Sequence, residues 1–289
     1  MSGIIYTTTG NRERGQVQNY HRKPNPLFLN KTKHGVDVAG LKKAERGTAI
    51  KFEGGDYEAK FTIGFEVEKN QLHRGAVREY ELFCGFERDG SCGYEAVTHV
   101  LPLLPSGQWR TKVYDMMHKA EKIIDDRYSP SDRRCGGHIT IAVDGLTGEQ
   151  LREAVRKYSG IIYALFRNRL KNSYCGSNNR MQTSQEAQHY HHKYQVALVK
   201  GNCLEFRLPS RFESVKQMMR RYELFYEVVN ASVSNMSHDA LLKRLKPVIV
   251  SMYNGDVARA EEVMTLSKYF RKFILTGEIH GDIAQYVSR

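Results

Sequence analysis

The sequence predicts an α+β protein, in which short strands form a sheet and helices pack on its outer face. Residues 59–68 alternate between apolar and polar side chains, which is the period of a strand. Further short apolar runs are bounded by glycine-containing turns, as expected of neighbouring strands. From residue 211 onward, apolar residues recur at helical spacing. Strands followed by a run of helices indicate the α+β class.

The elements follow from these periodicities. We expect strands at residues 48–53, 59–68, 79–87, 94–98, 135–143, 193–199 and 203–208. We expect helices at residues 107–127, 147–171, 211–231, 238–253 and 256–275. The predicted organisation is an irregular arm over 1–46, a main domain over 47–231 and C-terminal helices over 232–289 packed on that domain.

Composition narrows the class of protein. The chain has 289 residues, 40% of them hydrophobic, which is enough for a packed core. Its apolar runs are too short to cross a bilayer, and we see no secretory signal, so we expect no membrane partner. Five cysteines without a C-x-x-C pair favour reduced thiols in a cytoplasm over a zinc ribbon or a disulfide-stapled secreted fold. The sequence does not set the oligomeric state.

Glu66 and Glu68 stand on the polar parity of the run 59–68, with Val67 between them turned toward the core. Two carboxylates one strand step apart repel each other and are stable around a cation, and hard cations such as Mg2+ take oxygen ligands. The alternative is the solvated outer face of an edge strand. The pair alone does not decide between these readings.

Asp89 and Glu95 flank the next predicted turn. If their strands lie beside residues 59–68, the sheet collects four acids. Asp89-Gly90 also suits a simple hairpin turn, which is its commoner use. Glu95 is harder to explain in that way because it lies inside an apolar strand.

Further candidate site residues lie later in the chain, singly or in pairs. His138 follows two glycines that permit close approach of a ligand or strand, although a lone histidine is more often structural. Glu205 and Arg207 share one parity of a strand, which suits a metal-nucleotide or a simple ion pair between strands. Arg167 and Arg169 end a predicted helix, where the helix dipole favours cations.

The ordered motifs are G-F-E-V-E at 64–68, D-G-S-x-G-x-E at 89–95, G-G-H-I-T-I at 136–141, R-N-R-x-x-x-S-Y-C at 167–175 and L-E-F-R-L at 204–208. Over about 65–230, this set resembles the amidoligase family of glutamine synthetase-like carboxylate-amine ligases. The chain departs from the family pattern at Thr140, where a second histidine is common, and at Thr98-His99, where a Ser-Pro pair is common.

The resemblance implies a curved antiparallel sheet of the glutamine synthetase-like catalytic type, which binds ATP and two or more Mg2+ ions, with Mn2+ as an alternative metal. It implies that Arg207 steadies the phosphates and that Arg167 or Arg169 binds the nucleotide or the substrate carboxylate. Glu68, Glu205 and Arg207 are then catalytic, and His138 is also at the cofactor. The implied ligands of one metal are Glu66, Glu68 and Glu95, with Asp89 as a possible further ligand, and the implied ligands of a second metal are His138 and Glu205.

This set of carboxylates, a histidine and arginines suits an ATP-dependent ligase. A carboxylate attacks the γ-phosphorus of ATP to give an acyl phosphate, and an amine then displaces phosphate. That chemistry requires charge neutralisation and alignment rather than a protein nucleophile. The substrates would be small-molecule, peptide or protein carboxylates and amines, and the sequence does not specify which.

Two other functions compete with the ligase. Residues 1–51 hold ten Lys/Arg against three acids, a net charge of +7 within a total of +12, so the arm could bind nucleic acid or an acidic partner. In that case the sheet is a scaffold. A weaker alternative is a metal-dependent nuclease that uses the histidines at 189–192.

Overall fold

The structure is a computed structural model that describes residues 41–43, 50–52, 58–73, 82–98, 100–183 and 193–287. It confirms the α+β class and divides into two compact units. The first unit comprises residues up to Gly145 together with Arg211–Met219. The second unit comprises Leu146–Ser210 and Arg220–Arg289. The predicted domain boundaries at residues 46 and 231 stay predictions.

The first unit contains an antiparallel sheet in the order β5-β6-β4-β8, with β7 also paired to β4. A separate three-stranded antiparallel sheet has the order β1-β2-β3. The bounds are β1 Leu41–Lys43, β2 Ile50–Phe52, β3 Glu58–Ala59, β4 Phe61–Lys69, β5 Phe83–Asp89, β6 Gly93–Thr98, β7 Leu101–Pro102 and β8 Gly137–Val143. Of the predicted basic arm, only β1 is described, and His189–His192 lie outside the described residues.

Strand β4 is the central element of this sheet, and its alternating sequence explains its two faces. Ile63, Phe65 and Val67 are buried on one face, where the Phe65 ring meets the edge of Phe212 at a centroid distance of 5.6 Å. Glu66 and Glu68, on the other parity, are buried as well, each only 7% exposed. The end of β4 is therefore covered on both faces, and the alternative of a solvated strand edge is wrong.

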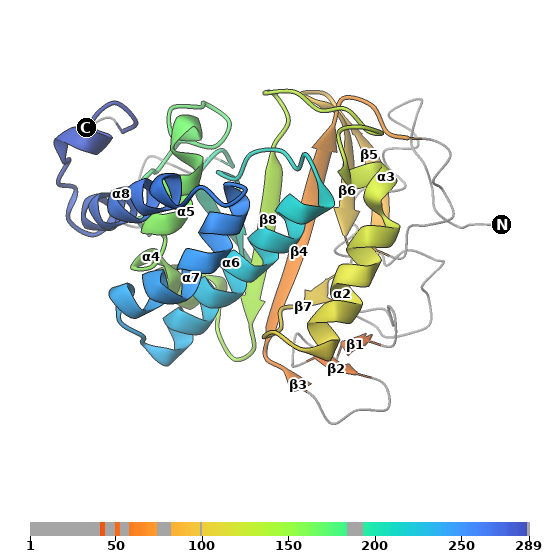
Figure 1. Cartoon of the computed structure of the whole chain (residues 1–289), viewed down its shortest axis with the longest axis horizontal. Helices are drawn as coiled ribbons and strands as arrows, with labels where there is room; N and C mark the ends of the chain where they lie inside the picture. The colour runs from red at the N-terminus through yellow and green to blue at the C-terminus, as the bar shows by residue number, and fades with distance from the viewer. Residues whose placement is uncertain are drawn as a thin grey trace. The chain divides into compact units, whose positions relative to one another are not determined.

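Helices α2 (Gln108–Lys119) and α3 (Glu121–Ile124) lie over one face of these strands (Figure 1). Val113, Met116 and Met117 form the buried stripe of α2. The sequence predicts one helix over 107–127, but the helix is interrupted at Ala120. Ile123 and Ile124 of α3 continue the buried surface beyond the break.

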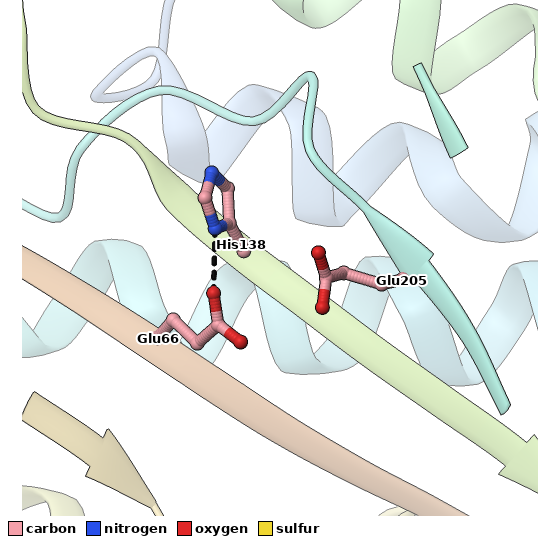
Figure 2. Close-up of side chains that lie close together, drawn as sticks. All are labelled: Glu66, His138 and Glu205. Carbon is pink, nitrogen blue, oxygen red and sulfur yellow. Dashed lines mark hydrogen bonds and ion pairs between the residues drawn. The ribbon is translucent and has the colours of Figure 1, made fainter. Parts of the chain in front are cut away.

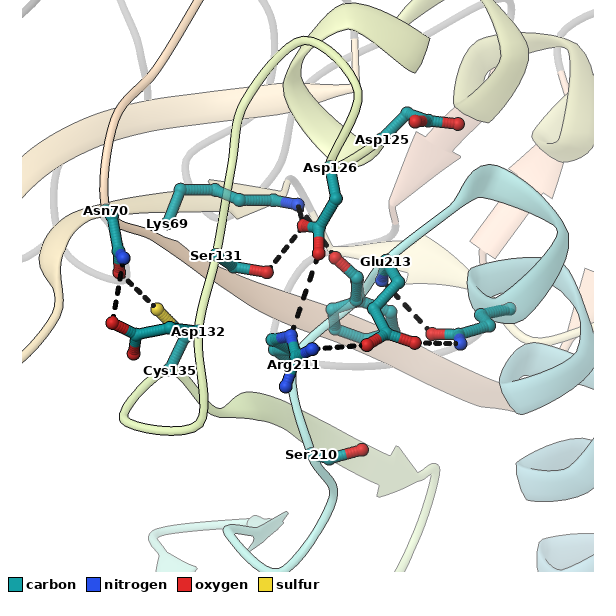
Figure 3. Close-up of polar contacts among 12 residues, drawn as sticks. Lys69, Asn70, Asp125, Asp126, Ser131, Asp132, Cys135, Ser210, Arg211 and Glu213 are labelled. Carbon is teal, nitrogen blue, oxygen red and sulfur yellow. Dashed lines mark hydrogen bonds and ion pairs between the residues drawn. The ribbon is translucent and has the colours of Figure 1, made fainter.

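Lys69 ties the end of β4 to two other segments of the first unit (Figure 3). Its side chain is fully buried, and its Nζ donates to Asp126 Oδ1 at 2.6 Å and to the carbonyls of Ile124 and Phe212 at 2.7 Å each. Burial lowers the pKa of the Lys69 ammonium, and the hydrogen bond to Asp126 opposes that shift. All three ammonium donors are used, so the charge is compensated.

The second unit combines one β-hairpin with helices. Its elements are α4 Gly148–Arg156, α5 Gly160–Phe166, η4 Arg167–Arg169, β9 Ala197–Lys200, β10 Cys203–Phe206, the part of α6 (Val215–Ser234) from Arg220, α7 His238–Met252, α8 Val257–Thr276 and η5 Gly281–Ile283. The predicted helix over 147–171 is interrupted between Arg156 and Gly160. The three C-terminal helices match their predicted positions closely.

Close backbone approaches hold the second unit together. The antiparallel hairpin β9-β10 packs on α4, where a Cβ added at Gly148 would lie 2.6 Å from the carbonyl oxygen of Gly201. Helix α8 packs on α5, where a Cβ at Gly160 would lie 2.3 Å from the carbonyl oxygen of Ser267. Both positions therefore require glycine. Within the described residues, no helix has the length and apolar character needed to cross a membrane.

Substituting Lys69 by Met should destabilise the protein by about 3 kcal/mol or more, because the Asp126 carboxylate loses its buried counter-ion and two carbonyls lose a donor. The exposed Lys60, just before β4, provides the control, and Lys60→Met should change stability by no more than about 0.5 kcal/mol. Urea unfolding followed by circular dichroism measures both variants. Equal midpoints for the two would contradict the structural role of Lys69.

His238, at the start of α7, should make the second unit sensitive to acid. Burial lowers the His238 pKa from 6.5 to about 4; Arg271 and Lys268 of α8 act in the same direction, and Asp239 opposes them. The unfolded chain binds the proton more readily, so stability is full above pH 6.5 and falls as the pH decreases toward about 4. After allowance for partial exposure, the loss should be about 1–2 kcal/mol.

His238→Gln should remove this part of the pH dependence, as measured by urea unfolding midpoints at about pH 5 and about pH 7.5. The exposed His118 of α2 is the matched control, and His118→Gln should keep the wild-type slope. A wild-type slope in the His238 variant would rule out this source of acid sensitivity.

Candidate metal centre

The registers of β4 bring four of the predicted site residues onto one face of the first unit's sheet. Glu66 lies directly opposite His138 on β8, and Glu68 lies directly opposite Glu95 on β6. Directly opposed residues in an antiparallel pair point to the same face, and so do residues two apart on one strand. Glu66, Glu68, Glu95 and His138 therefore share a face.

The imidazole of His138 lies between the two carboxylates of β4. Its Nδ1 is 2.6 Å from Glu66 Oε2, the contact drawn as a dashed line in Figure 2. Its Nε2 is 3.4 Å from Glu68 Oε1. His138 is only 6% exposed, so both contacts are shielded from solvent. The structure thus brings His138, one of the predicted site residues, into contact with both glutamates of the Glu66-x-Glu68 motif.

Glu68 is held by the backbone that precedes β8. The N–H of Gly136 donates to Glu68 Oε2 at 2.5 Å, while the other carboxylate oxygen faces His138. No lysine or arginine among the described residues pairs with Glu68. A buried carboxylate without a fixed cation is costly, and a bound metal ion is one way to compensate it.

The 3.4 Å gap between His138 Nε2 and Glu68 Oε1 fits a bridging metal ion. Two ligand atoms that each lie about 2.1 Å from one metal, at about 90–110° to each other, are separated by about 3.0–3.4 Å. The shorter contact at Nδ1 favours a tautomer in which Nδ1–H donates to Glu66, which leaves the Nε2 lone pair directed toward Glu68. The residues therefore fit a divalent metal.

Asp89 and Thr140 are two further residues of this region that the sequence analysis singled out. Asp89 ends β5 opposite Gly93, and its side chain lies outside what the structure describes, so its role as a ligand stays a prediction. Thr140 lies opposite Gly64, two residues along β8 from His138. The sequence did not predict the hydrogen bond from the Gly136 N–H to the Glu68 carboxylate, although the Gly136-Gly137 pair indicated a close approach of the backbone.

Glu205 and Arg207 meet in the second unit. The fully buried Glu205 accepts a hydrogen bond from Arg207 Nη1 at 2.6 Å and pairs with Lys200, its neighbour across the hairpin turn. Glu205 and Arg207 thus form an ion pair within one segment of the chain, whereas the pair between strands is made by Lys200 of β9, which was not predicted. The roles of Glu205 at a metal and of Arg207 at a phosphate stay predictions.

Arg167 has local partners in the second unit. It donates to the carbonyl of Ala164 at 2.8 Å, to Glu262 Oε1 at 3.1 Å and to the Tyr286 hydroxyl at 3.3 Å. These contacts agree with the alternative that it caps the end of α5. Arg169 is partly buried in η4, and its predicted contact with a nucleotide or substrate is untested.

No protein-family model matches the chain, and no curated protein matches it.

Glu68→Gln should weaken Mn2+ binding at least about tenfold, because an amide replaces the carboxylate that faces His138 Nε2. Glu66→Gln should have a smaller effect, because its amide oxygen still accepts the Nδ1–H hydrogen bond. Glu121→Gln, at a surface position of α3, is the control and should bind as the wild type does. Isothermal titration calorimetry measures all four proteins, and equal affinities would contradict the metal site.

Proposed function

We propose that the face shared by β4, β6 and β8 binds a divalent metal ion and that the protein is an ATP- and Mg2+-dependent carboxylate-amine ligase. The observation that carries the metal site is the 3.4 Å approach of His138 Nε2 to Glu68 Oε1, next to the hydrogen bond between His138 and Glu66. The ligase activity is supported by the order of the motifs along the chain, which resembles that of the amidoligases.

Within this proposal, the residues of the face divide into ligands and a positioning residue. Glu68 and His138 Nε2 are the direct ligands, and Glu95, which lies opposite Glu68, would contribute a further carboxylate oxygen. Glu66 was predicted as a ligand, but its contact with Nδ1 suits it to orient the imidazole. One nitrogen with several carboxylate oxygens accommodates Mg2+ and binds Mn2+ more readily.

The metal would neutralise phosphate charge during phosphoryl transfer. The chain's own residues then have three tasks. The Gly136 N–H fixes the Glu68 carboxylate, Glu66 fixes His138, and burial of both carboxylates keeps water from competing for the metal. In the reaction, a substrate carboxylate oxygen bonds to the γ-phosphorus of ATP as ADP leaves, and an amine nitrogen then forms the amide as phosphate leaves.

We extend the proposal to Glu205 as a ligand of a second metal and to Arg207 as a phosphate contact, on the basis of the L-E-F-R-L motif. Their pairing within the second unit lets the Glu205 carboxylate orient the Arg207 guanidinium. Lys200, which also pairs with Glu205, would have to give way to a metal. The curved glutamine synthetase-like sheet belongs to the same proposal.

A non-hydrolysable ATP analogue should bind the protein in the presence of Mg2+, and the affinity should fall about tenfold or more when EDTA replaces Mg2+ or when Glu68 is changed to Gln. Asp144→Asn, at an exposed position after β8, should leave binding unchanged. Calorimetry measures binding, and ADP release with a panel of amino acids, peptides and polyamines tests turnover.

Two results would contradict the ligase while leaving the metal site in place. One is analogue binding that is indifferent to EDTA and to the Glu68 substitution. The other is the absence of analogue binding in a protein that binds Mn2+.

A further inference from the structure

Two buried cysteines lie at neighbouring turns of the first unit. Cys92 ends the turn between β5 and β6 and is 5% exposed, and Cys135 precedes β8 and is 1% exposed. Neither cysteine forms a disulfide in the structure. The Cys135 thiol donates to Asn70 Oδ1, and the Cys92 thiol donates to the carbonyl of Tyr94. Although the two residues are far apart in sequence, Cys92 is the strongest influence on the pKa of the Cys135 thiol, so the two side chains lie close together.

Asn70, just after β4, fixes both turns. Its Oδ1 accepts a hydrogen bond from the Cys135 thiol at 3.0 Å, and its Nδ2 donates to Asp132 Oδ2 at 2.9 Å (Figure 3). On the other side, Gly93 has a φ of 122°, and a Cβ added there would lie 2.6 Å from the carbonyl oxygen of Asn70. The turn that carries Cys92 is thus pressed against the residue that holds Cys135.

We propose that Cys92 and Cys135 are a reversible disulfide pair that a peroxide oxidises. The thiolate of one cysteine attacks the peroxide, one oxygen atom leaves as water, and a sulfenic acid forms. The thiol of the other cysteine then displaces the sulfenic oxygen as a second water molecule. The S–S bond forms as two S–H bonds are lost, and a thiol reductant reverses the step.

The surroundings support this chemistry. The neighbouring Cys92 side chain holds the pKa of the Cys135 thiol below its usual value, and a backbone hydrogen bond from the Asp132 segment acts in the same direction. A disulfide requires the sulfur atoms to approach to about 2.05 Å, and the packing of both turns against Asn70 keeps the two side chains near each other. Gly90 and Ser91, next to Cys92, are exposed, so opening of this turn admits a small oxidant.

The site has a structural consequence. Cys135 directly precedes Gly136, whose N–H holds Glu68. A bond to Cys92 would anchor this backbone to the β5-β6 turn and close a loop from residue 92 to residue 135. The oxidised protein should therefore unfold at a higher temperature than the reduced protein.

Peptide mapping of the full chain tests the disulfide itself and does not depend on the metal site. The reduced protein is exposed to hydrogen peroxide, alkylated and digested with trypsin without reductant. We expect one linked pair of peptides, residues 89–110 with residues 135–152, lighter by two hydrogen atoms than the sum of the two. The link should disappear with dithiothreitol, and the unfolding temperature should rise on oxidation and return on reduction.

Cys92→Ser and Cys135→Ser should each abolish the link and the temperature shift. Cys175→Ser, which alters a buried thiol of the second unit, is the control and should keep both. Full alkylation of Cys92 and Cys135 after peroxide treatment would overturn the proposal. Oxidation of either residue to a sulfinic acid without a link would overturn it as well.

Discussion

Strand β4 is paired along both of its edges, and this double pairing places every residue of the candidate metal centre. Seven consecutive residues of β4 pair with β8, and four pair with β6. Because strand side chains alternate with a period of two, a slip of one residue against β8 would bring Val67 opposite His138 and direct both glutamates to the opposite face. Ile63, Phe65 and Val67 oppose such a slip, since it would remove them from the core. Apolar burial thus fixes the position of the charged groups.

The buried charges on the two faces of β4, Lys69 and Glu68, are compensated in different ways. Lys69, on the core parity, uses all three of its ammonium donors within the protein, so it is compensated by the fold itself. Glu68, one residue earlier and on the other face, has one backbone donor and a histidine nitrogen at 3.4 Å. The first arrangement is complete as it stands, whereas the second has room for a cation. This difference separates a structural charge from a candidate functional one.

The sequence predicted the parts of the site that depend on local periodicity. The alternation of residues 59–68 placed Glu66 and Glu68 on one face of a strand, and His138 was a candidate within the strand expected at 135–143. It could not supply the register that sets Glu66 opposite His138, because register depends on which strands meet. Lys69 was missed because its anchoring acceptors lie 55 to 143 residues away in the chain. The helix break before Gly160 was missed because tertiary packing favours it, as the close approach of Gly160 to the carbonyl oxygen of Ser267 shows.

Diffraction from a crystal soaked in Mn2+ tests the proposed metal site most directly. Data collected near the manganese absorption edge should show an anomalous peak between His138 Nε2 and Glu68 Oε1, about 2.1–2.2 Å from each atom, with Glu66 still bonded to Nδ1. The absence of a peak there at saturating Mn2+, with the 3.4 Å contact between His138 and Glu68 unchanged, would contradict the account.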